Sequence, residues 1–256
     1  MNFVYLTSTA VRHKAFVKHL SAFFPPALIV MEPKKSSGAV GSAMLNNYAE
    51  GLKETERSFF PQAVGWEPPG SMLETRPGGI NDEPVREAIR STNPDWLLVF
   101  GTSILGNDLL SVPKHHSLNI HTGLTQSFRG VDSSFWAIYD EMPQAIGTTV
   151  HLVDAKIDTG DVLLQGRPQL DPQDSLQTIF LKTVELGFNL MKDSLSGVIE
   201  GRLAPKMLPN KGKLYQSKHF TEAVLEEVLS KKTRVIQRYL QDKEELDKQI
   251  SLVNGL

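Results

Sequence analysis

The sequence predicts an α/β protein with a mostly parallel sheet, flanking helices and a short helical extension at its C-terminal end. The chain opens with a strand, a helix and a second strand, a unit that builds a parallel sheet. The run WLLVFG at 96–101 is apolar throughout, which is typical of a strand covered on both faces. With 256 residues, 40% of them hydrophobic, the chain can bury a sizeable core.

The first half of the chain is expected to alternate strands and helices. Apolar runs and helical periodicity predict a strand at 3–6, a helix at 8–23, a strand at 27–31 and a helix at 40–60. Proline and glycine make 61–79 an irregular loop. Asn81 or Asp82 then caps a helix that ends before Pro94.

The second half adds strands at 96–101, 117–121 and 147–154, and a hairpin arm at 161–170. Asp174 to Gln177 resembles a capping box for a helix that runs to about Ser196. The last predicted helix, at 221–247, is heavily charged and is expected on the surface. A sheet of this kind with helices on its faces is Rossmann-like.

Composition excludes several classes of protein. The net charge of −2 gives no basic surface for nucleic acid, and the absence of cysteine excludes disulfides and thiolate chemistry. No apolar run reaches membrane-spanning length, and the N-terminal run is too short for a signal peptide. We therefore expect a cytoplasmic protein. His115, His116, His151 and His219 have no metal-ligand spacing with carboxylates or thiols, so no metal is expected. An oxidoreductase that binds a dinucleotide is disfavoured, because no G-x-G-x-x-G follows an early strand.

One constellation of polar residues suggests chemistry. Asn119 and His121 lie two apart in a predicted strand and so share a face. A loop with three aspartates follows the strand at 147–154. Because chemistry gathers beyond the carboxyl ends of parallel strands, we expect these groups to meet. An amide can stabilise an oxyanion, an imidazole can move a proton, and a carboxylate can orient the imidazole or accept the proton of an amine. The set suits acyl transfer to an amine.

These residues also match a known pattern. Asn119-Ile120-His121, Arg129-Gly130, Trp136-Ala137-Ile138 and Ile157-Asp158-Thr159-Gly160-Asp161 resemble the formyltransferase family that uses 10-formyltetrahydrofolate. The resemblance implies that Asn119, His121 and Asp158 are catalytic, with Asp158 preferred over Asp161. It runs from about 95 to 200 and is weaker over the first sixty residues. It divides the chain into a catalytic domain at 1–204 and a C-terminal helical extension at 205–256.

The resemblance also implies where the folate cosubstrate binds. Family members hold the pterin with main-chain groups of two loops, which here would be the loops at 101–105 and 153–158. The candidate cofactor-binding residues are Gly101, Thr102, Ile104, Leu105, Val153, Asp154, Ile157 and Asp158. No metal takes part in this chemistry.

The amine acceptor is less well defined. The family's enzymes for initiator tRNA carry a further β-barrel domain, whereas the chain after Pro205 reads as helix. The family's purine enzyme has a glycine-rich phosphate loop after its first strand, and this chain has none at 6–10. We therefore expect a nucleotide-linked amino sugar as acceptor. An amino acid, phosphoribosylglycinamide and methionyl-tRNA remain alternatives, as does a folate-binding protein that is not an enzyme.

Candidate contacts to the acceptor come from two segments. The family's residues after the histidine are replaced here by Thr122 and Gly123, and Phe128 stands where the family has tyrosine. The candidate substrate-binding residues are Ser8, Arg12, Lys14, Thr122, Gly123 and Arg129. Apolar positions in the last helix, such as Val224 and Leu229, would suit either a cover for the core or a partner helix, so a homodimer stays open.

Overall fold

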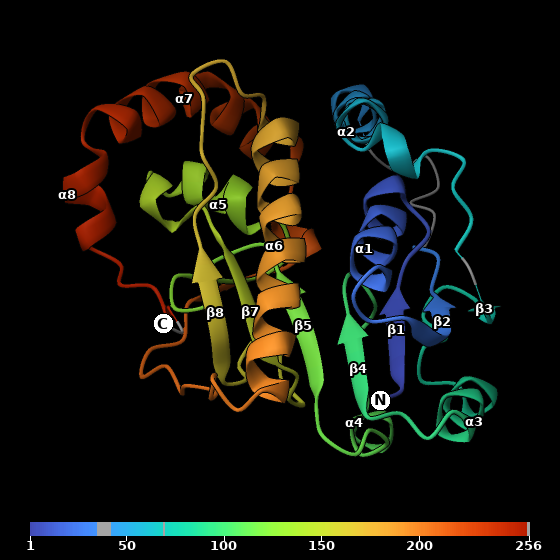
Figure 1. Cartoon of the computed structure of the whole chain (residues 1–256). Helices are drawn as coiled ribbons and strands as arrows, with labels where there is room; N and C mark the ends of the chain where they lie inside the picture. Colours follow the sequence, from blue (N-terminus) through green and yellow to red (C-terminus); the bar gives the residue numbers. More distant parts are fainter. Residues whose placement is uncertain (35–41, 69, 255–256) are drawn as a thin grey trace.

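The computed structural model describes residues 1–34, 42–68 and 70–254. Its centre is a seven-stranded sheet in the order β3-β2-β1-β4-β5-β7-β8 (Figure 1). The strands are β1 (Phe3–Thr7), β2 (Pro26–Met31), β3 (Met72–Glu74), β4 (Trp96–Val99), β5 (Ser117–His121), β7 (Thr148–Leu152) and β8 (Val162–Gly166). The strands from β3 to β5 are parallel, whereas β7 runs antiparallel to both β5 and β8. The predicted α/β fold with a mostly parallel sheet is confirmed.

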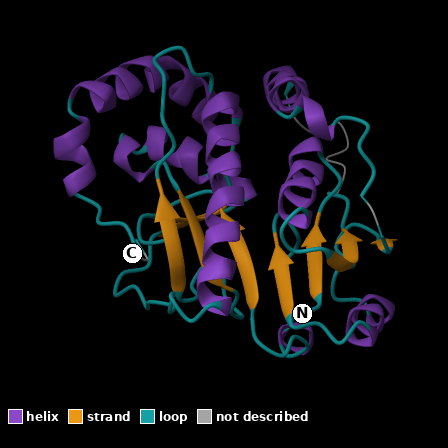
Figure 2. Ribbon diagram, viewed as in Figure 1, coloured by secondary structure: helices purple, strands orange, loops and turns teal. Residues whose placement is uncertain are grey.

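Helices cover both faces of the sheet (Figure 2). The helices are α1 (Val11–Ser21), α2 (Ala43–Phe59), α3 (Glu83–Ser91), α4 (Asn107–Leu110), α5 (Ser133–Tyr139), α6 (Leu176–Ile199), α7 (Glu222–Gln241) and α8 (Lys243–Lys248). None of the helices in the described residues is long and apolar enough to span a membrane.

The side chains of β1 point alternately into two separate hydrophobic cores, one on each face of the sheet. Tyr5 packs on one face with Phe16 of α1 and Phe188 of α6, while Leu6 packs on the other face with Ile89 of α3. Successive strand residues point to opposite faces, so a strand that is apolar at every position must be covered on both sides. This explains the continuous apolar runs of β1 and β4.

The order in which the chain adds strands to the sheet changes side at β1. It first builds β2 and β3 on one side of β1, and then crosses to place β4 and β5 on the other side. In open parallel sheets a crevice forms beyond the carboxyl ends of the strands at such a switch point. The fold therefore offers a binding site near the ends of β1 and β4.

The C-terminal part of the chain covers a third core. The predicted helix at 221–247 is interrupted at Asp242, which separates α7 from α8. The apolar face of α7 is buried, with Leu225, Val228 and Ile236 in a cluster that includes Trp136 of α5. Leu229 stays 47% exposed. The expectation of a charged surface helix was thus incomplete, because α7 also closes the core over α5.

Several short elements were not predicted. The loop at 61–79 contains a 3-10 turn at Pro61–Ala63 and the edge strand β3. A separate two-stranded parallel sheet joins β6 (Phe128–Gly130) to β9 (Lys213–Tyr215). Three-residue strands are too short to show a period in the sequence. The predicted start of a helix at 40 lies outside the described residues, within which α2 begins at Ala43.

Candidate active site

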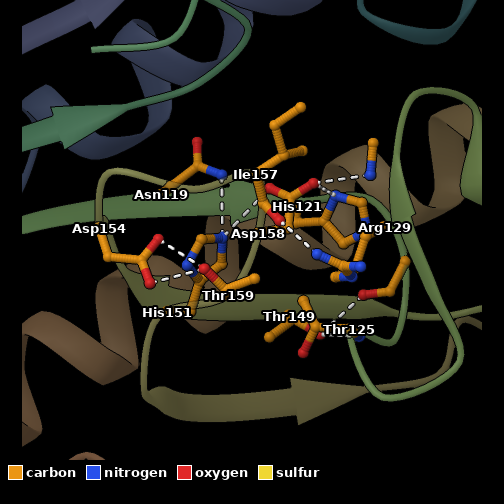
Figure 3. Close-up of polar contacts among 12 residues, drawn as sticks. Asn119, His121, Thr125, Arg129, Thr149, His151, Asp154, Ile157, Asp158 and Thr159 are labelled. Atoms are coloured by element: carbon orange, nitrogen blue, oxygen red, sulfur yellow. Dashed lines mark hydrogen bonds and ion pairs between the residues drawn. The ribbon is translucent and has the colours of Figure 1, made fainter. Parts of the chain in front are cut away.

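Asn119 and His121 project from the same face of β5, as the spacing predicts. Asn119 is half-buried and His121 is 5% exposed. In the antiparallel pairing with β7, Asn119 lies opposite His151 and His121 lies opposite Thr149. Figure 3 shows this group of polar side chains, with a carboxylate between the two imidazoles.

That carboxylate is Asp158, and it reaches the histidines by an unexpected route. We expected the aspartate loop to begin at the same sheet edge as the end of β5. Because β7 is antiparallel, its last residue, Leu152, instead pairs with Leu118 near the start of β5. The loop folds back over the sheet to bring Asp158 to His121.

Two backbone features allow this return of the loop. Asp158 adopts a left-handed conformation with φ of 48°, which aspartate tolerates better than most residues. Gly160 packs so tightly that an added Cβ would lie 1.8 Å from the carbonyl oxygen of Leu152. A side chain at Gly160 would therefore displace the loop that carries Asp158.

The Asp158 carboxylate has three polar neighbours. Its Oδ2 lies 3.3 Å from Nδ1 of His121 and accepts a 2.8 Å hydrogen bond from the N–H of Gly130. Its Oδ1 lies 3.5 Å from Nε2 of His151. Burial by itself would raise the pKa of Asp158, but the two histidines and the Gly130 N–H outweigh it and hold this pKa well below its usual range. Asp158 is therefore ionised at neutral pH.

The His121 ring is held at both nitrogens. While Nδ1 faces Asp158, Nε2 lies 3.1 Å from the carbonyl oxygen of Phe128 and 3.1 Å from Oγ of Ser133. Burial lowers the pKa of His121, and the charge of Asp158 works against that shift. Both ring nitrogens thus face oxygen atoms that stabilise an added proton, so His121 can gain a proton as negative charge develops nearby.

His151 is a member of the site that the sequence did not reveal. Its Nδ1 lies 2.7 Å from the carbonyl oxygen of Leu152, and its Nε2 lies 3.1 Å from Nδ2 of Asn119. This contact holds the Asn119 amide in place beside Asp158. The only sequence signal was that His151 alternates in phase with Thr149 along a predicted strand, and alternation cannot say which residue on the next strand it meets.

A cavity of about 630 Å³ lies beside these groups. Its lining includes Asn119, His121 and Asp158. It also includes every candidate cofactor-binding residue: Gly101, Thr102, Ile104, Leu105, Val153, Asp154, Ile157 and Asp158. The two loops expected to hold a pterin therefore face the same space as the candidate catalytic groups. The Asp154 carboxylate itself accepts from Thr159 and from the N–H of Lys156, which stiffens the second loop.

The candidate substrate-binding residues divide into two groups. Arg12 and Thr122 line the cavity. Ser8 is buried, and Lys14 pairs with Glu67 at 2.9 Å. These two do not line the cavity, and neither do Gly123 and Arg129.

Gly123 and Arg129 instead shape the surroundings of Asn119, His121 and Asp158, the candidate catalytic triad. An added Cβ on Gly123 would lie 2.6 Å from Nε2 of His121. Arg129 donates to the carbonyl of Ile157 at 3.2 Å and to the carbonyl of Gly212 at 2.8 Å. Arg129 thus connects the Asp158 loop to the C-terminal part of the chain.

Glu32 is a second residue that the sequence analysis missed. It follows β2 and is only 2% exposed. Its Oε1 accepts from the N–H of Ile80 at 3.2 Å, and its Oε2 accepts from the N–H of Ser103 at 2.6 Å. Ser103 belongs to the first of the two loops that line the cavity, so the carboxylate holds this loop in place.

Replacing Glu32 with glutamine is expected to loosen that loop. The amide of glutamine turns one N–H donor toward a backbone N–H, and a buried donor without a partner costs about 1–3 kcal/mol, equivalent to roughly 5- to 150-fold in an equilibrium constant. We expect weaker binding of folinic acid in calorimetry. Glu87→Gln, on the exposed face of α3, is the control. An unchanged affinity in Glu32→Gln would show that the loop does not depend on this carboxylate.

The arrangement has the groups that acyl transfer needs. The Asn119 amide and the His121 ring can stabilise an oxyanion, and the ionised Asp158 orients the ring. Within the part of the chain that the structure describes, no group of three or more histidine, cysteine or acidic side chains is placed to hold a metal ion. These groups resemble, in kind and order, the pattern noted in the sequence.

Comparisons with known proteins agree with this pattern. Residues 26–195 match the family model described as formyl transferase. Methionyl-tRNA formyltransferase of Anaeromyxobacter dehalogenans is 31% identical over 146 residues, which are 57% of this chain and 46% of that protein. The chain thus aligns with about half the length of such curated relatives.

Solved structures share the fold at low sequence identity. A sugar N-formyltransferase from a Shewanella species has a TM-score of 0.58 at 17% identity, covering 86% of this chain and 78% of that one. An N-formyltransferase from Helicobacter canadensis, solved with folinic acid and dTDP-3-aminofucose, has a TM-score of 0.55 at 15% identity, covering 86% and 73%.

Proposed function

Because the chain belongs to the formyl transferase family, we propose that it transfers the formyl group of 10-formyltetrahydrofolate to the primary amine of a small molecule. One observation supports this most strongly. Asn119, His121 and Asp158 line the same cavity as both loops expected to hold the pterin. A folate bound by these loops would therefore present its formyl group close to the catalytic groups.

The proposed reaction has no enzyme-bound intermediate. The amine nitrogen attacks the formyl carbon, and the carbonyl electrons move onto the oxygen. An N–H of Asn119 and the His121 ring stabilise that oxyanion, while Asp158 stays ionised and holds the ring through Nδ1. Collapse of the adduct breaks the bond from carbon to N10 of the folate, and N10 takes up a proton.

We further propose that the acceptor is an amino sugar linked to a nucleotide. The cavity continues past the triad to Arg12 at the start of α1, so an acceptor longer than its reacting amine can be held there. Arg12 is anchored by a salt bridge to Glu56 of α2 and is 18% exposed. A fixed guanidinium in the lining of a cavity suits a phosphate. The Helicobacter neighbour, bound to dTDP-3-aminofucose, gives a first compound to test.

Release of tetrahydrofolate from 10-formyltetrahydrofolate tests both levels of the proposal. The acceptors compared are dTDP-3-aminofucose, glycine, phosphoribosylglycinamide and methionyl-tRNA. We expect the fastest release with the nucleotide-linked sugar. Faster release with another acceptor would contradict the sugar proposal but retain formyl transfer. Failure of folinic acid to bind in calorimetry would contradict the formyltransferase function itself.

A further inference from the structure

Asp132 is an acidic side chain in the same cavity that the triad does not use. It lies between β6 and α5, two residues after Gly130, whose N–H binds Asp158. Its backbone is left-handed, with φ of 54° and ψ of 40°. Although Asp132 occupies the cap position of α5, its side chain makes no capping hydrogen bond. Its exposed carboxylate therefore remains available to a molecule in the cavity.

The carboxylates of Asp132 and Asp158 differ in their surroundings. Asp158 already contacts two imidazoles and a backbone N–H, and these contacts make it a weak base. Among the described residues, no hydrogen bond or ion pair is formed by the side chain of Asp132. The protein around the cavity raises the pKa of Asp132, and the charge of Arg12 partly opposes this. Tyr48 of α2 is an ionisable group whose pKa the Asp132 charge helps to raise, and Lys34 after β2 lines the same cavity.

The reaction needs a base close to the amine of the acceptor. When the amine nitrogen has bonded to the formyl carbon, it carries a positive charge and must lose a proton. The group that accepts this proton has to face the acceptor side of the cavity, be open to it and have a free lone pair. Asp132 lines the cavity and is exposed, and its side chain makes no capping hydrogen bond, whereas the oxygens of Asp158 are turned toward the histidines.

We propose that Asp132 is a further catalytic residue, which binds the acceptor amine and takes its proton. This inference rests on the proposed function. The amine nitrogen forms its bond to the formyl carbon, and one proton then passes from that nitrogen to the Asp132 carboxylate. As the bond from carbon to N10 breaks, its electron pair stays on N10, and N10 receives the proton from Asp132 directly or through water. One proton moves from the amine to N10, and no net charge is created.

The acceptor that fits is therefore a primary amine. Beside its reacting nitrogen it carries a hydrogen-bond donor for the Asp132 carboxylate. Asp132 would hold that donor group, and Arg12, which lines the same cavity, would hold an anionic group of the acceptor. A carboxylate and a guanidinium in one cavity favour one orientation of the acceptor.

Asp132→Asn is the test, because asparagine tolerates the left-handed backbone and keeps the shape. The probes are ethanolamine and hydroxylamine, and the readout is release of tetrahydrofolate. Hydroxylamine is much the less basic amine, so its adduct loses a proton with less help from a base. We expect kcat to fall about 100-fold with ethanolamine and clearly less with hydroxylamine. Asp193→Asn on α6, outside the cavity, is the control for loss of one carboxylate.

Two further measurements separate catalysis from damage to the fold. Folinic acid should bind Asp132→Asn and the wild-type protein equally in calorimetry. Carboxyl ¹³C NMR should show Asp132 titrating above Asp158. Equal loss with both amines, no loss with either, or a wild-type protein that binds folinic acid but formylates neither amine would overturn the inference. A wild-type protein that does not bind folinic acid would instead contradict the proposed function.

Discussion

Replacing His121 with alanine is expected to lower the turnover of formyl transfer by roughly 10²–10⁴-fold, and Asn119→Ala should fall in the same range. His121→Ala removes the ring that Asp158 contacts at Nδ1 and that we propose stabilises the developing oxyanion. Asn119→Ala removes an amide whose orientation is fixed by His151. Single-turnover measurements of tetrahydrofolate release would follow the chemical step directly.

The affinity for folinic acid should change little in both variants, because the pterin contacts are expected to be mainly from the backbone of two loops. His116→Ala is a matched control, since His116 is exposed and does not line the cavity. Turnover close to wild-type in His121→Ala or Asn119→Ala would exclude that residue from the catalytic group.

Asp158→Asn should abolish activity more completely than Asp161→Asn. The asparagine keeps the size of the side chain but removes the charge that orients His121, a loss worth about 10⁴-fold where a carboxylate orients a catalytic imidazole. Asp161 contributes its main-chain carbonyl to Leu152, a contact that Asp161→Asn leaves in place. Turnover in both variants decides the assignment, and a greater loss in Asp161→Asn would transfer the catalytic role to Asp161.

Asp158→Asn should also change how the free energy of unfolding depends on pH. The pKa of Asp158 is lower in the folded state than in the unfolded chain, so its ionised form stabilises the fold. This contribution is complete above the unfolded-state value of about 3.9 and is lost as the pH falls through the lower folded-state value. Denaturant titrations should therefore show Asp158→Asn less stable than wild-type at neutral pH, with the difference shrinking as the pH falls below about 4.

Local periodicity was sufficient to predict part of the site. Asn119 and His121 share a face because strand side chains alternate, and nothing distant is needed for that result. The motif also led to Asp158, but the physical reason given for its position was wrong. The sequence does not show that β7 is antiparallel, and the loop reaches His121 only because it turns back through Asp158 and Gly160.

The residues that were missed depend on contacts between distant segments. His151 meets Asn119 through the register of β5 and β7, which no pattern within either strand specifies. Glu32 binds Ile80 and Ser103, 48 and 71 positions away. In the same way, β6 pairs with β9 at Arg129 and Leu214, far apart in the sequence, and each strand is too short to be recognised alone.

The pairing of β6 with β9 has a consequence for the order in which the protein is made. Gly130 of β6, which binds Asp158, lies opposite Tyr215 of β9, so closely that an added Cβ would lie 2.0 Å from the Tyr215 carbonyl oxygen. Every residue of the triad leaves the ribosome before this strand does. A nascent chain ending at 204 would hold all three side chains but lack the strand that fixes the backbone around Gly130. The active site would then be complete only late in synthesis, when residues near 215 pair with β6.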